Sequence, residues 1–166
     1  MSTDTLTERE SVLEMALRML QSLELLEAEW AEWREALEAQ ELLERYWDPT
    51  EPEEAEEYLE ERETVRLYLE RQAEEGYQSE YVSEDADPVM QWLESSLDLV
   101  TISESRSGGE PEPRGWEILL CYGGPSAGLE LKIDGRATVW AAWWSPTERV
   151  SGRLDWLANY LEEMGL

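Results

Sequence analysis

The feature that most restricts the fold is an apolar repeat at helical spacing near the N-terminus. Its members recur every three or four positions: Leu13, Ala16, Leu20, Leu23, Leu26, Trp30, Trp33 and Leu37. The mean step of about 3.4 residues is close to the 3.5 of a coiled-coil seam. We therefore predict one long helix that begins near Thr5 or Thr7 and runs to about Trp47, where Asp48-Pro49 interrupts it.

A second helical pattern follows after only a few residues. Thr50 and Glu53 are spaced as a capping box, and Gly76 is a typical residue for the helix end. Between them, apolar residues keep the three-to-four spacing: Ala55, Tyr58, Leu59, Val65, Leu69 and Ala73. The short link predicts an antiparallel helical hairpin over residues 1–76, followed by a polar connector over 77–86.

Residues 87–166 change from helical spacing to alternation. Asp87-Pro88 opens a short helix, and strands are expected at 98–104, 115–122, 127–133 and 136–144. Asp134-Gly135 is a strong hairpin signal between the last two strands. Ser145-Pro146-Thr147-Glu148 is expected to open a final helix, whose inner stripe is Val150, Leu154, Leu157, Leu161 and Met164. The predicted fold class is α+β: an acidic helical hairpin, then a four-stranded antiparallel sheet with a packed C-terminal helix, in an α-β-β-β-β-α module.

Composition excludes several kinds of chemistry. The 166-residue chain has no histidine and one cysteine, so neither a Ser-His-Asp triad nor a multi-cysteine metal site can form within it. Cys121 lacks a histidine base and is expected to be a structural thiol. No Asp-x-Asp-x-Asp-Gly calcium loop is present, and Gly123-Gly124-Pro125 has no following Gly-Lys-Ser/Thr. We predict no catalytic residues, no metal and no cofactor. Paired glutamates for acid–base work are the enzymatic alternative.

Charge and hydropathy restrict the partners. The chain carries 40 acidic and 13 basic side chains, a formal net charge of −27, which disfavours direct binding to nucleic acid or an anionic membrane. Its longest uninterrupted apolar run, Val139 to Trp144, is too short to span a bilayer. Met1-Ser2-Thr3-Asp4 has neither a basic start nor a following apolar stretch. A cytoplasmic protein with a basic protein partner is the expectation.

The negative charge is concentrated in the first half. Residues 1–85 hold 27 acidic and seven basic side chains. On a helix, side chains four positions apart lie about 6 Å apart, which resembles the phosphate spacing of a nucleic-acid strand. The candidate partner-binding residues on the two helices are Glu35, Glu38, Glu53, Glu54, Glu57, Glu60 and Glu61. A face that serves only solubility, or adaptation to high salt, is the alternative interpretation of the same pattern.

Tryptophans form a second candidate surface. Trp143 and Trp144 are adjacent, so in a strand their side chains point to opposite faces of the sheet. One can pack against the last helix, while the other meets either the helical hairpin or, in an exposed patch, a dimer partner or a target protein. Core packing is the commoner outcome for tryptophan, and we include both residues among the candidate partner-binding residues. The near-heptad seam and the surplus of tryptophans are compatible with a homodimer.

Two resemblances bear on function. The segment Leu119-Leu120-Cys121-Tyr122-Gly123-Gly124-Pro125, with the later Ala141-Ala142-Trp143-Trp144, resembles small uncharacterised proteins of phages and plasmids. The extreme acidity resembles anti-defence proteins of mobile elements that mimic DNA, of the antirestriction and anti-CRISPR kind. The second resemblance is one of composition, and it implies an inhibitor that occupies a nucleic-acid-binding defence complex. An acidic adaptor module with a Trp-rich interface is the alternative.

Overall fold

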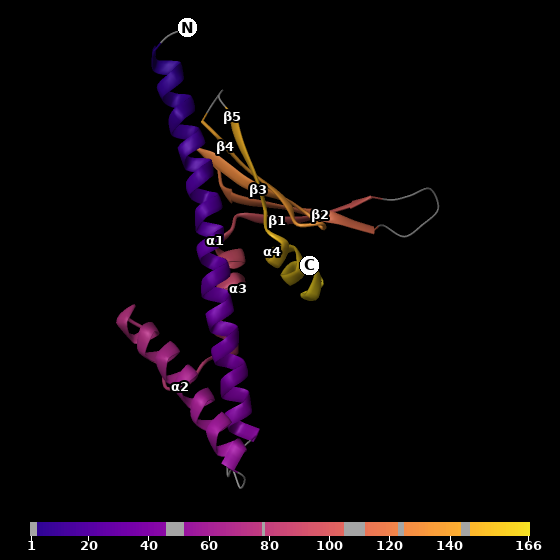
Figure 1. Cartoon of the computed structure of the whole chain (residues 1–166). Coiled ribbons are helices and arrows are strands. Elements are labelled where there is room, and N and C mark those ends of the chain that lie inside the picture. The colour runs from indigo at the N-terminus through magenta and orange to yellow at the C-terminus, as the bar shows by residue number, and fades with distance from the viewer. Residues whose placement is uncertain (1–2, 46–51, 78, 105–111, 123–124, 144–146) are drawn as a thin grey trace. The chain divides into compact units, whose positions relative to one another are not determined.

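The computed structural model describes residues 3–45, 52–77, 79–104, 112–122, 125–143 and 147–166. Its elements are α1 (Thr3–Arg45), α2 (Pro52–Glu74), a 3-10 helix (Glu84–Ala86), α3 (Pro88–Ser95), β1 (Asp98–Glu104), β2 (Glu112–Cys121), β3 (Ser126–Lys132), β4 (Arg136–Ala142), β5 (Thr147–Arg153) and α4 (Asp155–Glu163), as labelled in Figure 1. The chain divides into two compact units. Unit 1 comprises residues 1–27 and 92–166, and unit 2 comprises residues 28–91.

Unit 2 is built on the helical hairpin that the sequence predicts. Its small core consists of Trp33 and Ala36 of α1 and Val82 of the connector, which are buried. Val65, Tyr68 and Leu69 of α2 pack against this core, as do Trp30 and Leu37 of α1. Val65 and Leu69 of the predicted α2 stripe therefore pack as expected, whereas Leu59 of the same stripe is 62% exposed. The link over residues 46–51, with the predicted break and the Thr50 cap, lies outside the described residues.

The end of α2 has the backbone pattern of a Schellman motif. Gly76 has a φ of 97°, a conformation that residues with a Cβ atom rarely adopt. Its N–H donates to the carbonyl of Ala73 at 3.1 Å, and the N–H of Tyr77 donates to the carbonyl of Gln72 at 2.9 Å. The predicted helix end at Gly76 is confirmed. The turn also fixes the direction in which the chain leaves the helix at Tyr77.

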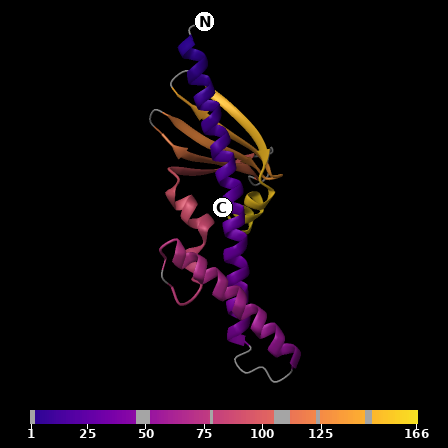
Figure 2. The same ribbon diagram turned by 60° about the vertical axis from the view of Figure 1, so that its left-hand side comes forward.

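Unit 1 contains an antiparallel meander in which the strands follow the order β1-β2-β3-β4-β5. Figure 2 shows the sheet with its strands side by side. The Asp134-Gly135 hairpin is present, and Ile133 is also part of the connection because β3 ends at Lys132. Gly135 has a φ of 80°, and its N–H donates to the carbonyl of Lys132 at 2.9 Å. The loop residues therefore allow the tight reversal between β3 and β4.

One face of the sheet forms the core of unit 1. Its central positions are fully buried: Trp116 and Ile118 of β2, Ala127, Leu129 and Leu131 of β3, and Ala137, Val139 and Ala141 of β4. From α4, Leu157 and Leu161 are buried, and from the N-terminal part of α1, Val12, Ala16 and Leu23 are buried. A Cβ atom at Gly152 of β5 would lie 3.2 Å from the side chain of Leu20. The first part of α1 therefore packs on the sheet at β5.

The opposite face of the sheet is only partly covered. Gly128 and Trp140 are cross-strand partners on this face, and a Cβ atom at Gly128 would lie 2.8 Å from Cζ2 of Trp140. The indole therefore lies directly over the glycine backbone, which no larger residue would allow. Arg149 of β5 is paired with Glu130 of β3 at 2.7 Å on the same face. This face combines a half-buried aromatic ring with exposed charges.

The structure corrects the prediction of four strands and a long last helix. Thr147–Arg153 forms a fifth strand, and the final helix begins only at Asp155. Exposed and half-buried residues alternate along β5, and Val150 pairs with Val139 of β4. Pairing with the edge of β4 satisfies a whole row of backbone groups, and this tertiary gain outweighs the local helix-start signal. The predicted cap at Ser145-Pro146 lies outside the described residues.

The short helix before the sheet agrees with its predicted start. Asp87 is buried, and its Oδ1 accepts hydrogen bonds from the N–H groups of Val89 at 2.8 Å and Met90 at 3.3 Å. A side-chain oxygen in this position satisfies N–H groups that have no partner within the helix.

Among the described residues, no helix combines the length and the apolar character that crossing a bilayer requires.

Candidate partner-binding surface

The glutamates predicted from the sequence lie on the two helices of unit 2. Glu53, Glu57 and Glu60 of α2 are exposed, and Glu54 and Glu61 are half-buried. Glu35 and Glu38 of α1 are exposed. Unit 2 holds 22 acidic and five basic side chains among residues 28–91, a net charge of −17. Most of the negative charge of the chain therefore belongs to this helical unit.

Four of these glutamates line one groove between the helices. Glu35 and Glu38 come from α1, and Glu60 and Glu61 come from α2. Ala39, Leu42 and Thr64 complete the groove, which has a volume of about 280 Å³. Glu53, Glu54 and Glu57 are not among its lining residues and lie nearer the start of α2. The structure thus brings together four of the seven predicted glutamates, and we call these four the groove glutamates.

Arginines of unit 2 are largely engaged by neighbouring glutamates. Arg66 pairs with Glu63 and Glu70 at 2.5 Å each, and Arg34 pairs with Glu38 at 2.9 Å. The hydrogen bond from Arg66 lowers the pKa of the Glu63 carboxyl. These pairs are exposed, so each contributes little to stability. Their main effect is to offset the charges of Arg34 and Arg66 locally, while the unit as a whole keeps its net negative charge.

The predicted tryptophan pair is described only in part. Trp143 follows β4 and is 43% exposed, which is large for an indole side chain. Trp144 lies outside the described residues. Trp143 belongs to unit 1, whereas the groove glutamates belong to unit 2. The two predicted surfaces therefore belong to different units.

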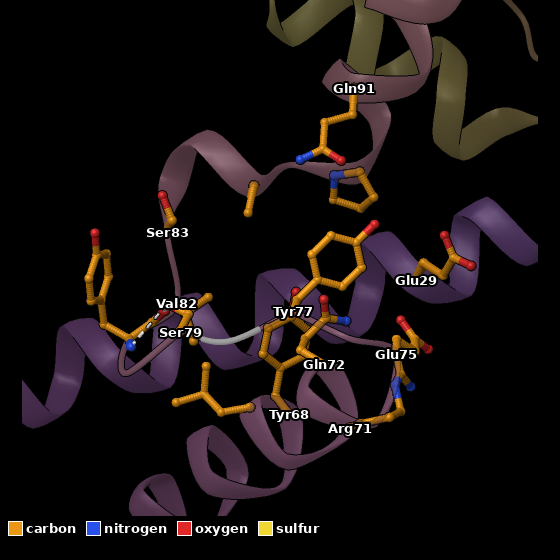
Figure 3. Close-up of a pocket in the computed structure, with 14 residues that line it drawn as sticks. Glu29, Tyr68, Arg71, Gln72, Glu75, Tyr77, Ser79, Val82, Ser83 and Gln91 are labelled. Atoms are coloured by element: carbon orange, nitrogen blue, oxygen red, sulfur yellow. Dashed lines mark hydrogen bonds between the residues drawn. The ribbon is translucent and has the colours of Figure 1, made fainter.

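A larger pocket in unit 2 was not predicted from the sequence. It has a volume of about 430 Å³ and lies between α2, the segment that follows it, and residues of α1 and α3. Its lining includes three tyrosines, Tyr68, Tyr77 and Tyr81, and two glutamates, Glu29 and Glu75. We call it the tyrosine pocket (Figure 3). The two tyrosines in the polar connector after Gly76 are the sequence signal that could have indicated it.

Val82 and Ser83 form one wall of the tyrosine pocket, and side chains of α1 hold this wall by hydrogen bonds to its backbone groups. Gln40 of α1 donates through Nε2 to the carbonyl of Val82 at 2.9 Å and accepts from the Val82 N–H through Oε1 at 2.6 Å. Trp33 Nε1 donates to the carbonyl of Ser83 at 3.1 Å. Val82 is 3% exposed, so its polar backbone groups need these partners. Val82 and Ser83 of the connector are thus fixed against α1.

Negative potential surrounds the central tyrosine of this pocket. Burial is the main cause that raises the pKa of the Tyr68 hydroxyl, and the carboxylates of Glu75 and Glu29 raise it further. Arg71 also lines the pocket, but it forms an ion pair with Glu32. Among the described residues, no ion pair engages Glu29 or Glu75.

The described residues do not assemble a metal centre, since no group of three acidic or cysteine side chains in them has a suitable arrangement. Cys121 ends β2 and is half-buried. In comparisons with known proteins, no family model, no curated protein and no solved structure matches the chain.

Proposed function

We propose that the chain is a non-enzymatic inhibitor that occupies the nucleic-acid-binding surface of a host defence complex, of the CRISPR or restriction kind, in the host cytoplasm. The observation that carries this proposal is the groove in which Glu35 and Glu38 of one helix face Glu60 and Glu61 of another. Two glutamate rows on opposed helices present carboxylates on both sides of a groove, as a duplex presents phosphates on two strands. A single amphipathic helix would offer only one such row.

The electrostatics of unit 2 fit this role. A net charge of −17 on 64 residues gives a strong negative potential, which steers a basic partner during association. Each exposed contact between a carboxylate and an arginine or lysine contributes little. An array, however, releases many of the ions that surround a basic channel, and this makes binding steeply dependent on salt. Like charges at adjacent helical positions also destabilise the helices by a few tenths of a kcal/mol per pair, a cost that lysines would remove if solubility were the only requirement.

The test compares two variants with the same net charge. In the first, the groove glutamates Glu35, Glu38, Glu60 and Glu61 are replaced by Gln. In the second, four exposed glutamates of unit 2 outside the groove, Glu41, Glu44, Glu74 and Glu80, are replaced by Gln. Displacement of labelled DNA from purified defence complexes is followed by fluorescence anisotropy over a series of salt concentrations.

We expect the wild-type chain to displace DNA at low salt and the groove variant to lose at least tenfold in apparent affinity. The control variant should lose about threefold or less, because only the long-range field changes. Equal losses in both variants would move the contact away from the groove. No displacement by the wild type at low ionic strength, across restriction and CRISPR complexes, would refute mimicry of nucleic acid.

An acidic adaptor module is the second candidate function, and the exposure of Trp143 favours it. An indole that is 43% exposed offers a large apolar contact to a partner protein. Replacing Trp143 with Ser separates the two functions. Loss of partner binding in this variant, with DNA displacement intact, would support the adaptor.

A further inference from the structure

The tyrosine pocket has the dimensions of a site for one side chain or small ligand. Its volume of about 430 Å³ falls in the range typical of ligand pockets. It is lined by residues of unit 2 alone, so its geometry does not depend on the placement of the other unit. Gln40 and Trp33 hold one wall against α1, and the Schellman turn at Gly76 sets the position of Tyr77. The site is therefore built before any ligand arrives.

Aromatic faces are accessible in this pocket. Tyr77 is 65% exposed and Tyr81 is 63% exposed, whereas Tyr68 is half-buried. Figure 3 shows the side chains of Tyr68 and Tyr77 in the middle of the pocket, with Glu29 and Glu75 to one side of them. A tyrosine ring attracts a cation through the negative potential of its face. Exposed rings beside carboxylates therefore favour a positively charged group.

The charges that line the pocket select the sign of the ligand. Glu29 and Glu75 both line the pocket, and their carboxylates add to burial in raising the pKa of the Tyr68 hydroxyl. Arg71 is the basic side chain among the described lining residues, and its Nη1 is paired with Glu32. An anion would be repelled by the two carboxylates and by the negative face of a ring. A cation would be attracted by the carboxylates and by the ring face.

The polar lining favours a guanidinium over an ammonium. Gln72 and Gln91 carry amide oxygens, and the tyrosines carry hydroxyl oxygens, so hydrogen-bond acceptors surround the pocket on several sides. A guanidinium group has five N–H donors in a planar fork and can stack on an aromatic ring while it donates. An ammonium group has three donors and no flat face.

We propose that the tyrosine pocket binds an arginine side chain of the basic partner protein. Glu29 and Glu75 supply the opposite charge, and the rings of Tyr68 and Tyr77 supply the stacking surface. The identity of the partner rests on the proposed function, while the chemistry of the pocket does not. An arginine held in this pocket would fix the orientation of the partner on a surface whose other contacts are non-directional charge pairs.

The probe for the test is Nα-acetyl-arginine amide, and its matched control is Nα-acetyl-citrulline amide, which has the same shape without the charge. The protein carries 13C-labelled tyrosine rings, and each of the seven tyrosine signals is assigned by single Tyr→Phe replacement. Titration should shift the ring signals of Tyr68 and Tyr77 with the arginine probe and saturate, with little effect of the citrulline probe.

The charge variants complete the test. Glu29→Gln together with Glu75→Gln should weaken binding of the arginine probe about fivefold to tenfold, because two partly exposed carboxylates are lost. Glu41→Gln together with Glu74→Gln removes the same charge from exposed positions outside the pocket and should change the affinity less than twofold. All four residues are exposed, so both variants should retain the spectrum of the folded chain.

Equal binding of both probes, equal effects of the two charge variants, or probe-induced shifts confined to other tyrosines would overturn the arginine site. These outcomes are independent of DNA displacement. If the chain binds the arginine probe saturably but displaces no DNA, the arginine site stands and nucleic-acid mimicry is rejected. If the chain displaces DNA but Tyr68 does not respond to the probe, mimicry stands and the arginine site is rejected.

Discussion

Replacing Gln40 with Ala should detach the wall of the tyrosine pocket from α1. The Gln40 side chain makes two hydrogen bonds with the backbone of Val82, at 2.9 Å and 2.6 Å, and so imitates a neighbouring strand. Val82 is 3% exposed and belongs to the core of unit 2 with Trp33 and Ala36. Alanine leaves its N–H and its carbonyl without these partners, while the Trp33 bond to Ser83 remains.

The size of the effect follows from the number of groups left unsatisfied. Each buried polar group without a partner costs about 1–3 kcal/mol. Gln40 is half-buried, so water can reach part of the vacated space, and we expect a total of about 2–4 kcal/mol for the two groups. If the connector opens locally, this corresponds to an increase of about 30- to 1,000-fold in the exchange rate of the Val82 amide hydrogen.

Native-state hydrogen exchange measured by NMR is the appropriate assay, because it reports on the Val82 amide itself. Gln40→Glu is an informative second variant. Its carboxylate can still accept from the Val82 N–H but cannot donate to the Val82 carbonyl, so its effect should be intermediate. Glu41→Ala changes the adjacent exposed position and should leave the exchange rate unchanged. An unaltered Val82 rate in a folded Gln40→Ala variant would refute the role of Gln40 as the anchor.

Three further predictions concern other parts of the chain. Gly128→Ala should destabilise unit 1 by about 1–3 kcal/mol in urea unfolding, since its Cβ would overlap the Trp140 ring. Gly152→Ala should destabilise it less, because only the flexible end of the Leu20 side chain is near. A larger loss of stability for Gly152→Ala than for Gly128→Ala would contradict this packing. Hydrogen bonds from Arg136 lower the pKa of the Asp134 carboxyl, so the stability that this pair contributes is present above the ordinary carboxyl pKa and is lost as the pH falls through the lowered value. Arg136→Gln should return the Asp134 pKa toward its ordinary value in an NMR titration, and an unchanged pKa would contradict the pairing. Raising NaCl from about 20 to 500 mM should slow amide exchange in α2, because salt screens repulsion between its glutamates, and faster exchange would indicate that ion pairs dominate.

Local signals in the sequence were sufficient to predict the helices of unit 2. The apolar stripes of α1 and α2 have the helical period, and Gly76 occupies the position where a left-handed conformation ends α2. These features depend on residues within a few positions of one another. For the same reason, the hairpin at Asp134-Gly135 and the start of α3 at Asp87-Pro88 were predictable.

The fifth strand was not predictable in the same way. Thr147–Arg153 begins with a sequence that also suits a helix start, and its alternation includes only one large apolar residue, Val150. Pairing with β4 decides between the two structures, because it satisfies backbone groups that a short isolated helix would leave to solvent. The outcome depends on a neighbouring strand, which local patterns do not include.

The period of the helices, the end of α2 at Gly76 and the excess of glutamate can be recognised from residues that are close together in the chain. Which glutamates share a groove and which tyrosines share a pocket depends instead on how distant segments pack. Glu29 and Glu75 lie 46 positions apart, yet both line the tyrosine pocket. The packing of Val65 and Leu69 against Trp33 sets how α2 is rotated against α1, and this rotation selects the side chains that meet. Burial of the apolar side chains thus decides which charged side chains lie together, although the charged side chains are not part of the core.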